Sequence, residues 1–144
     1  MIEYKVRVWA NGSRAWYRKG KRHRENGAAI ERADGDREWW INGKRHREDG
    51  AAIEWTNGSR AWYINGNLHR EDGPATEWAD GDREWYLNGK RHRENGAACE
   101  WADGAREWYI NGEKLTEQEF NARNKCNKVV TIDGVDYQLI EVNK

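Results

Sequence analysis

One repeated unit of 23 residues constrains this chain more than any other feature. Near-identical stretches begin at Gly20, Gly43, Gly66 and Gly89, each close to G-K-R-H-R-E-D-G-A-A-I-E-W-A-D-G-D-R-E-W-Y-I-N. A fifth start at Gly112 departs from this pattern at once, and residues 9–19 repeat residues 55–65 with small changes. A fixed period of this length is typical of one supersecondary unit stacked on copies of itself. It predicts an array, and not an enzyme core built around one pocket.

The composition favours a folded domain rich in aromatic residues. Aliphatic side chains are scarce, but the formal net charge is 0 and the chain has 10 Trp and 6 Tyr. Disordered segments combine high net charge with few aromatics, whereas each large ring can bury roughly 150–250 Å². We therefore predict one domain, or one array with caps, in which a few large rings supply most of the apolar surface.

The sequence also bears on location. No apolar run approaches about 18 residues, and the first residues lack the charged-then-apolar layout of a secretion signal. We expect no membrane span. Cys99 and Cys126 replace apolar or polar repeat positions without metal-ligand spacing, which favours reduced thiols in a cytoplasmic protein.

Each repeat contains Asp-Gly or Asn-Gly pairs between β-favouring residues, the strongest short-range signal for a β-hairpin. If Asn57-Gly58 is a two-residue turn, Trp55 lies opposite Arg60. Side chains alternate along strands, so each hairpin should have two distinct faces. One face is predicted to carry Ala51, Ile53, Trp55, Arg60, Trp62 and Ile64, and the other Ala52, Glu54, Ala61, Tyr63 and Asn65.

The segment from Asn65 to Gly73 connects one hairpin to the next. Its own turn signal is compatible with a third short strand. We predict a structured loop instead, because three strands would reverse the direction of alternate repeats.

The pattern changes after Gly112. Thr116 is predicted to cap a short helix of about two turns, and Asp133-Gly134 is predicted to be the turn of a last hairpin formed by residues 129–132 and 137–140. We expect residues 1–114 to form the array and residues 115–144 to form an α/β cap over its end. The predicted fold class is thus mainly β, an elongated antiparallel sheet of about five tandem hairpins with a small C-terminal helix and hairpin.

The segments Asn88-Gly89-Lys90-Arg91-His92 and 102–112, which run from A-D-G to Y-I-N-G, resemble the MORN repeat family over roughly residues 4–114. The resemblance implies an elongated sheet of successive hairpins and a scaffold, dimerisation or membrane-association role, so binding and not catalysis. The glycine that usually follows the loop histidine is replaced here by Arg24, Arg47, Arg70 and Arg93.

The Trp-rich H-R-E-D-G-P-A variant is similar to small repeat proteins of phage and bacterial genomes. This similarity implies a phage-type factor that acts in the host cytoplasm and docks on a host protein, for example a defence component, to modulate or inhibit it.

Two recurring groups invite a chemical interpretation. His23, His46, His69 and His92 recur in the loops, but equivalent side chains should lie about 10 Å apart, too far for ligands of one zinc ion. We predict loop-stabilising imidazoles, no metal and no cofactor.

The second group is acidic. Under the same pairing Glu31 faces Glu38, and the pairs Glu77–Glu84 and Glu100–Glu107 repeat this arrangement. Opposed like charges destabilise a sheet, so the loop arginines Arg24, Arg70 and Arg93 are expected between them. A cation site and acid–base catalysis are the alternatives.

The same pairing places Trp55 with Arg60, Trp78 with Arg83 and Trp101 with Arg106 as cation–π pairs. An aromatic sheet face without a second layer usually marks an interaction surface. We predict a non-enzymatic protein-binding or assembly module whose partner is another protein or a second copy in a homodimer. Its predicted binding residues are Trp55, Arg60, Trp62, Trp78, Arg83, Trp85, Trp101, Arg106 and Trp108.

Nucleic-acid or nucleotide binding through Arg and Trp is the alternative function. Residues 1–24 hold eight Lys or Arg against Glu3 alone, which is the charge distribution that phosphate binding requires. The phosphate patch of that alternative consists of Arg18, Lys19, Lys21, Arg22 and Arg24.

Overall fold

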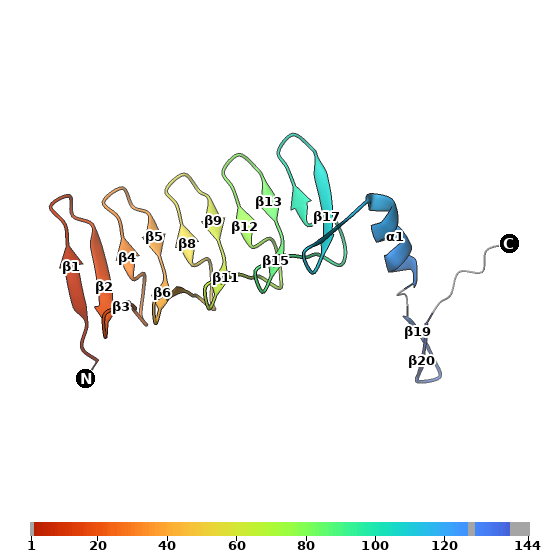
Figure 1. Cartoon of the computed structure of the whole chain (residues 1–144), viewed down its shortest axis with the longest axis horizontal. Coiled ribbons are helices and arrows are strands. Elements are labelled where there is room, and N and C mark those ends of the chain that lie inside the picture. Colours follow the sequence, from red (N-terminus) through yellow and green to blue (C-terminus); the bar gives the residue numbers. More distant parts are fainter. Residues whose placement is uncertain (1, 127–128, 139–144) are drawn as a thin grey trace.

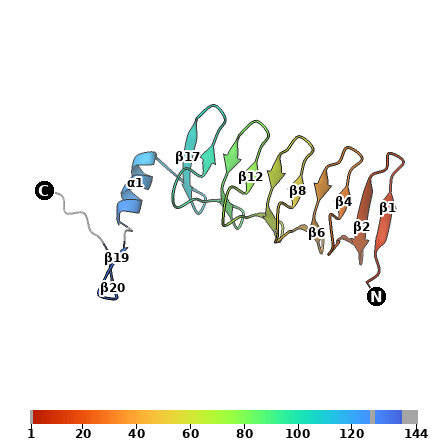
Figure 2. The same cartoon turned by 180° about the vertical axis from the view of Figure 1, so that it is seen from behind.

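The computed structural model describes residues 2–126 and 129–138. The chain is mainly β, and its hairpins stand side by side in one open row, with a helix and a separate hairpin beyond the last of them (Figure 1). The view from behind shows the same row (Figure 2). The predicted elongated antiparallel sheet of tandem hairpins with a small C-terminal helix is therefore confirmed.

Five upper hairpins build the main sheet. They are β1–β2 (Lys5–Val8, Arg14–Arg18), β4–β5 (Ile30–Glu31, Arg37–Glu38), β8–β9 (Ile53–Glu54, Arg60–Ala61), β12–β13 (Thr76–Glu77, Arg83–Glu84) and β16–β17 (Cys99–Glu100, Arg106–Ile110). Each strand pairs antiparallel with its neighbours, in the order β1-β2-β4-β5-β8-β9-β12-β13-β16-β17-β18.

A second row of short hairpins lies where the sequence predicts structured loops. Its members are β6–β7 (Trp40–Ile41, Lys44–Arg45), β10–β11 (Tyr63–Ile64, Asn67–Leu68) and β14–β15 (Tyr86–Leu87, Lys90–Arg91), while β3 (Lys21–Arg22) pairs with β2 and β18 (Glu113–Leu115) with β17. The prediction that the segment after Asn65 is a loop was wrong. Asn65 (φ 50°) and Gly66 (φ 86°) both have positive φ, as a two-residue type I′ turn requires. Four strands per repeat, an even number, keep successive repeats in the same direction.

The upper turns are one residue longer than predicted. Gly58 N–H donates to the Trp55 carbonyl (3.0 Å), and Trp55 N–H donates to the Ser59 carbonyl (3.0 Å). Only Gly58 has positive φ in this turn (91°), so the connection has three residues, with a type I turn followed by a left-handed glycine. The predicted two-residue turn at Asn57-Gly58, with Trp55 opposite Arg60, was therefore wrong.

This shift of one residue reassigns the two faces of the sheet, because side chains alternate. Ile53 pairs with Ala61, and Glu54 pairs with Arg60. We call the side of Ile53, Ala61 and their copies the core face, and the side of Glu54, Arg60 and their copies the arginine face. Arg60 thus lies with Glu54, and not with Ile53 as the predicted faces had it.

The core is narrow and made of small side chains. Ala28, Ala29 and their copies in the next loops are buried, together with the column Ile30, Ile53, Thr76 and Cys99. Burial raises the pKa of the Cys99 thiol to about 11, so Cys99 behaves as an apolar residue.

Side chains tie each upper turn to the next one. Ala33 N–H donates to Ser13 Oγ (3.0 Å) and Ala79 N–H to Ser59 Oγ (3.0 Å). In the other two junctions an aspartate takes the place of the serine, and the bonds run from Thr56 N–H to Asp36 Oδ1 (2.8 Å) and from Ala102 N–H to Asp82 Oδ1 (2.7 Å). The repeats are thus joined at their tips as well as through the sheet.

The C-terminal helix α1 (Glu117–Cys126) begins where the sequence predicts. Glu119 N–H donates to Thr116 Oγ1 and Thr116 N–H to a Glu119 carboxylate oxygen, which forms a capping box. The Thr116 N–H and hydroxyl both donate to the Glu119 carboxylate and lower its pKa. Phe120 is buried, and α1 contacts the last hairpin, β17–β18.

The predicted last hairpin is present as β19 (Val129–Ile132) and β20 (Val135–Gln138). Asp133 and Gly134 form its turn with positive φ (52° and 77°). Residues 139 and 140, which the prediction included, lie outside the described residues. Within the ranges described, no helix has the length and apolar character needed to cross a membrane.

Candidate protein-binding surface

The arginine face carries an alternating row of charges across the main sheet. Cross-strand pairs join its members in the order Arg14, Glu31, Arg37, Glu54, Arg60, Glu77, Arg83, Glu100 and Arg106. Because directly paired residues point to the same side of a sheet, these nine side chains form one line along the array.

Every glutamate in this row is held by an arginine from the adjacent loop. Arg70 Nη1 lies 3.0 Å from Glu77 Oε1, donates to the Pro74 carbonyl (3.1 Å) and places its guanidinium carbon 3.9 Å from the Trp62 ring centroid. The other three units repeat this geometry, as Arg24–Glu31–Trp16, Arg47–Glu54–Trp39 and Arg93–Glu100–Trp85. Arg24, Arg70 and Arg93 thus bind glutamates as predicted, but each binds the glutamate of this row and does not lie between two facing glutamates.

The loop glycine makes room for this arginine. A Cβ at Gly73 would lie 2.9 Å from the guanidinium carbon of Arg70, closer than real Cβ contacts. The glycine of the H-R-E-D-G motif therefore allows the close packing of this arginine.

The strand arginines are left without partners, although each lies beside glutamates in the row. Within residues 2–126, none of their side chains makes a hydrogen bond, an ion pair or a cation–π contact, and all five are exposed: Arg14, Arg37, Arg60, Arg83 and Arg106. The loop arginine takes the glutamate because it gains a carbonyl and a tryptophan ring at the same time. The row thus keeps one free cation per repeat.

Two predicted arrangements were wrong because they depended on the two-residue turn. Glu38 lies opposite Ile30, and Glu31 opposite Arg37, so the glutamates do not face each other; the pairs Glu77–Glu84 and Glu100–Glu107 are separated in the same way. The described hairpins also lack the predicted cation–π pairs, which are Trp55–Arg60, Trp78–Arg83 and Trp101–Arg106.

The predicted binding residues divide between the two faces. Arg60, Arg83, Arg106, Trp62 and Trp85 lie on the arginine face. Strand alternation places Trp55, Trp78 and Trp101 at the hairpin tips on the other face, where Arg32 occupies the equivalent position and bonds Glu38 (2.8 Å). There Trp55 stacks on Trp78, with 5.4 Å between ring centroids. Trp108, on β17, is half-buried and pairs with Leu115 of β18.

Shallow grooves separate successive loops beside the arginine row. One of about 750 Å³ is lined by Arg70, Trp85, His92 and Arg93, and equivalent grooves of about 650 and 680 Å³ precede it. Their rims carry carboxylates with side chains 84–86% exposed: Glu48, Asp49, Glu71, Asp72 and Glu94. The prediction did not include this acidic border, whose signal is the E-D or E-N pair that recurs in each loop.

The loop histidines join neighbouring repeats, as the prediction of a stabilising role requires. Asn88 N–H donates to His69 Nδ1 (3.0 Å), and His46 and His92 accept equivalent bonds from Asn65 and Asn111. His69 Nε2 lies 3.7 Å from Glu71 Oε1. Since Nδ1 accepts, the ring must be the tautomer protonated at Nε2.

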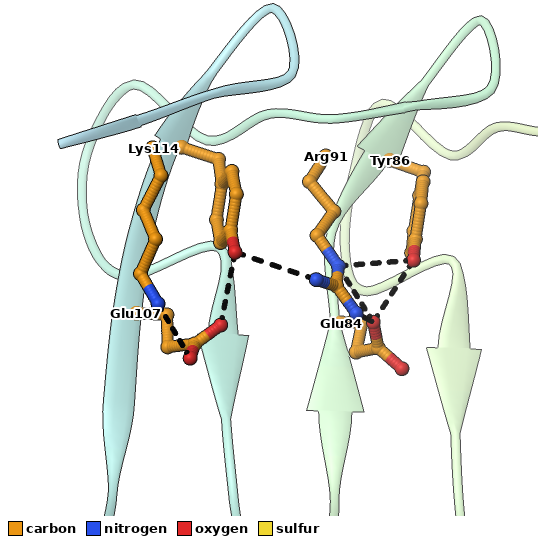
Figure 3. Close-up of polar contacts among 6 residues, drawn as sticks. Glu84, Tyr86, Arg91, Glu107 and Lys114 are labelled. Carbon is orange, nitrogen blue, oxygen red and sulfur yellow. Dashed lines mark hydrogen bonds and ion pairs between the residues drawn. The ribbon is translucent and has the colours of Figure 1, made fainter.

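On the core face, buried carboxylates are held by arginines of the second hairpin row. Arg91 donates to Glu84 Oε2 (2.9 Å) and to Tyr86 Oη (3.1 Å), and Figure 3 shows the contacts of Arg91 with both side chains. Burial disfavours the charge on Arg91, but the bonds to Tyr86 and Glu84 outweigh that effect and raise its pKa. Burial also raises the pKa of Tyr86. In the next repeat, the hydrogen bond from Lys114 lowers the pKa of Glu107.

The N-terminal basic cluster is largely engaged within the chain. Arg18 pairs with Glu25 (3.0 Å), Arg24 belongs to the first loop unit, and the guanidinium of Arg22 lies 5.1 Å from the Trp40 ring. Only Lys19 and Lys21 of the predicted phosphate patch are exposed without a partner inside the described part of the chain. The patch is therefore smaller than the sequence predicts.

No family model matches this chain, and no curated protein matches it either.

Proposed function

We propose that this protein is a non-enzymatic, MORN-like binding module that docks on another protein through its arginine face. The observation that carries the proposal is the row of five exposed strand arginines, one in each repeat, whose neighbouring glutamates are already bound by loop arginines. Guanidinium groups suit carboxylates because they donate in a planar fork. The partner surface should therefore present carboxylates at the spacing of the repeat, about 10 Å for two strands.

Tryptophan and arginine together favour a protein partner. Arg, Trp and Tyr dominate the residues that carry binding energy in protein interfaces. Here Trp62 and Trp85 are half-buried under Arg70 and Arg93, so their rings are held rigid before a partner arrives. A surface that is already ordered loses little conformational entropy on binding.

The acidic border argues against nucleic acid. Glu71 and Asp72 are highly exposed beside the row, and a polyanion lying along the arginines would run next to them. The formal net charge of the chain is 0, which gives no long-range attraction for phosphates. A protein can match both the cationic row and its acidic border.

The test compares two double variants of equal charge change. Arg60→Glu with Arg83→Glu alters the middle of the row, whereas Lys19→Glu with Lys21→Glu alters the basic cluster. Each form is immobilised and used to capture proteins, after nuclease treatment, from cells that express the chain. We expect one stoichiometric partner to be retained by the wild type and by the lysine variant, and to be lost at least about tenfold from the arginine variant.

Thermal unfolding of both variants must match the wild type for this comparison to hold. Binding of the wild type to a single-stranded oligonucleotide that weakens steeply with salt, and that disappears only in the lysine variant, would replace the proposal with the phosphate-binding alternative.

A further inference from the structure

The two ends of the array differ in how they treat the edge of the sheet. At one end α1 packs against β17 and β18. At the other end β1 pairs with β2 on one side, and among the described strands nothing pairs with its second side. Strand edges with free N–H and C=O groups are templates for another strand.

The free edge of β1 is apolar as well as unpaired. Val6 and Val8 are 47% and 63% exposed, and they lie on the same side of the strand. Lys5 and Arg7 lie on the other side. Trp9 N–H donates to the Ser13 carbonyl of the β1–β2 turn. By alternation, the N–H groups of Val6 and Val8 therefore point away from β2.

The hairpin β19–β20 has the complementary properties. All its described residues are exposed, including Val135 (53%) and Tyr137 (51%). Residues 129–138 contain Asp133 and Asp136 and no Lys or Arg. An isolated two-stranded hairpin is only marginally stable in water, so this one gains from a further strand.

We propose that β20 of one molecule adds, parallel, to the free edge of β1 in a second molecule. In this register Val135 pairs with Val6, Asp136 with Arg7 and Tyr137 with Val8. The backbone permits it: Val135 lies next to the type I′ turn and bonds Ile132 across it, so the N–H groups of Asp136 and Gln138 point outward. Parallel pairing joins outward groups of one strand to residues one position removed on the other, as this register requires.

The charge of Arg7 favours β20 over β19 as the strand that adds to β1. The same parallel geometry on β19 would place Val130, Thr131 and Ile132 against Val6, Arg7 and Val8, so Arg7 would meet a hydroxyl and not a carboxylate. On β20 it meets Asp136, whose neighbours on both sides are apolar.

The second strand must come from another copy. Nine strand-to-strand steps separate β1 from β17, about 43 Å at about 4.8 Å per step. Only residues 127 and 128 connect α1 to β19, and two residues reach about 7 Å. The ends that fit each other are thus at opposite ends of one chain (Figure 1). A head-to-tail contact of this kind leaves one unpaired end on each side of a pair, so that further molecules can be added to form a chain.

This inference does not rest on the proposed function, because it uses the sheet edge and not the arginine row. It is tested by sedimentation of the full chain over a wide range of concentration. The wild type should grow in average mass without a plateau as concentration rises. A constant monomer mass, or a plateau at the dimer, would overturn the proposal.

A charge exchange tests the register. Arg7→Asp and Asp136→Arg should each weaken self-association at least about tenfold, since each places like charges together. An equimolar mixture of the two variants should assemble again, because each molecule then offers an end that complements the other. Assembly in either variant alone, or its absence in the mixture, would contradict the proposed pairing.

A backbone change tests the ladder. Val6→Pro removes an outward N–H without removing a bond to β2, and it should abolish growth. Val6→Thr keeps that N–H and the β propensity, so it should retain most of the assembly. Equal behaviour of the two variants would show that added-strand pairing does not occur.

Discussion

The two faces of the sheet differ in how far the same residue types recur from one repeat to the next. On the arginine face, the loop arginine, its tryptophan and its glutamate are the same residue types in all four units, for example Arg70, Trp62 and Glu77. On the core face, the central buried position varies, from Ile30 and Ile53 in the first two repeats to Thr76 and Cys99 in the next two. The residue types of the arginine face thus vary less among the repeats than those of the core face.

The changes on the core face are coordinated between partners. Glu38 with Arg45, Glu84 with Arg91 and Glu107 with Lys114 form ion pairs. The second repeat has Ala61 and Leu68 at the same two positions. In that repeat both members of the pair are exchanged together. The first unit has Ala15 and Arg22 at these positions, and Arg22 lies over the Trp40 ring, so neither unit leaves a buried carboxylate without a cation.

The core-face ion pair is thus replaced as a unit in the second repeat, whereas all four units keep the contact of the loop arginine with its ring, carbonyl and carboxylate. Arg70 bonds a carboxylate and a carbonyl and covers a ring, and Gly73 must stay small beneath it. No exchange of one partner satisfies the others. On the core face Arg91 also donates to Tyr86 and Tyr109, but among the described residues its hydrogen bonds all go to side chains and none goes to a backbone carbonyl.

The largest expected effect comes from splitting a core-face pair. Arg91→Leu leaves Glu84, whose side chain is only 12% exposed, without its cation and should lower the free energy of unfolding by about 3 kcal/mol. Adding Glu84→Ala copies Ala61 and Leu68 of the second repeat and should restore stability to within about 1 kcal/mol of the wild type. Urea unfolding of the wild type, both single variants and the double variant measures this cycle. A double variant as unstable as Arg91→Leu would show that the pair is not exchangeable.

The matched experiment on the arginine face should give the opposite pattern. Arg70→Leu loses a charged hydrogen bond, a carbonyl bond and the contact with Trp62, at a cost of about 2 kcal/mol. Glu77→Gln added to it should not restore stability, because the Pro74 carbonyl and the ring remain without a partner. If the double variant regained the lost free energy of unfolding in the same urea titration, the two faces would not differ in this respect.

Acid should act on the core face through Glu38. Burial opposes its charge, but the hydrogen bond from Arg32 and the charge of Arg45 outweigh burial and lower its pKa below the usual 4.5. A lowered carboxyl pKa in the folded state stabilises the protein above about pH 4.5, and this contribution is lost as pH falls through the folded-state pKa. Glu38→Gln should therefore cost about 1.5 kcal/mol at neutral pH.

The same variant separates charge from shape. The difference in unfolding free energy between the wild type and Glu38→Gln should shrink as pH falls from 6 to about 3. A difference that stays constant over this range would mean that the carboxylate contributes by packing alone.

The sequence predicted the hairpin array, the helix cap at Thr116 and the turn at Asp133-Gly134 correctly, because each depends on local backbone preference. It could not fix the register. Asn57-Gly58 and Asn65-Gly66 are the same dipeptide, yet the first lies in a three-residue turn and the second in a two-residue turn. A shift of one residue moves every side chain to the other face, which is why the predicted glutamate and cation–π pairs failed.

The sequence predicts the strand arginines as binding residues, but for a reason that the structure does not support. Arg60 and Arg83 were expected to cover tryptophans, whereas loop arginines do so and leave the strand arginines unpaired. Which of two arginines binds a glutamate depends on a carbonyl of the loop and on the ring that precedes it. These lie four and eight residues from Arg70, and only the folded loop brings both to one guanidinium. The basic cluster appeared larger than it is for the same reason, since Arg18 and Arg24 find acids beyond their immediate neighbours.

The smallest expected effect concerns the end of the array, where the tip bonds stop. Asp82→Ala removes the acceptor for Ala102 N–H and should cost about 1 kcal/mol. Ala105 occupies the equivalent position in the last upper hairpin, after which no further upper hairpin follows among the described residues. Ala105→Asp has no such donor to accept from and should change the free energy of unfolding by less than about 0.5 kcal/mol. Thermal unfolding of the two variants decides the point. A gain in Ala105→Asp as large as the loss in Asp82→Ala would mean that the aspartate stabilises its own turn and does not join one repeat to the next.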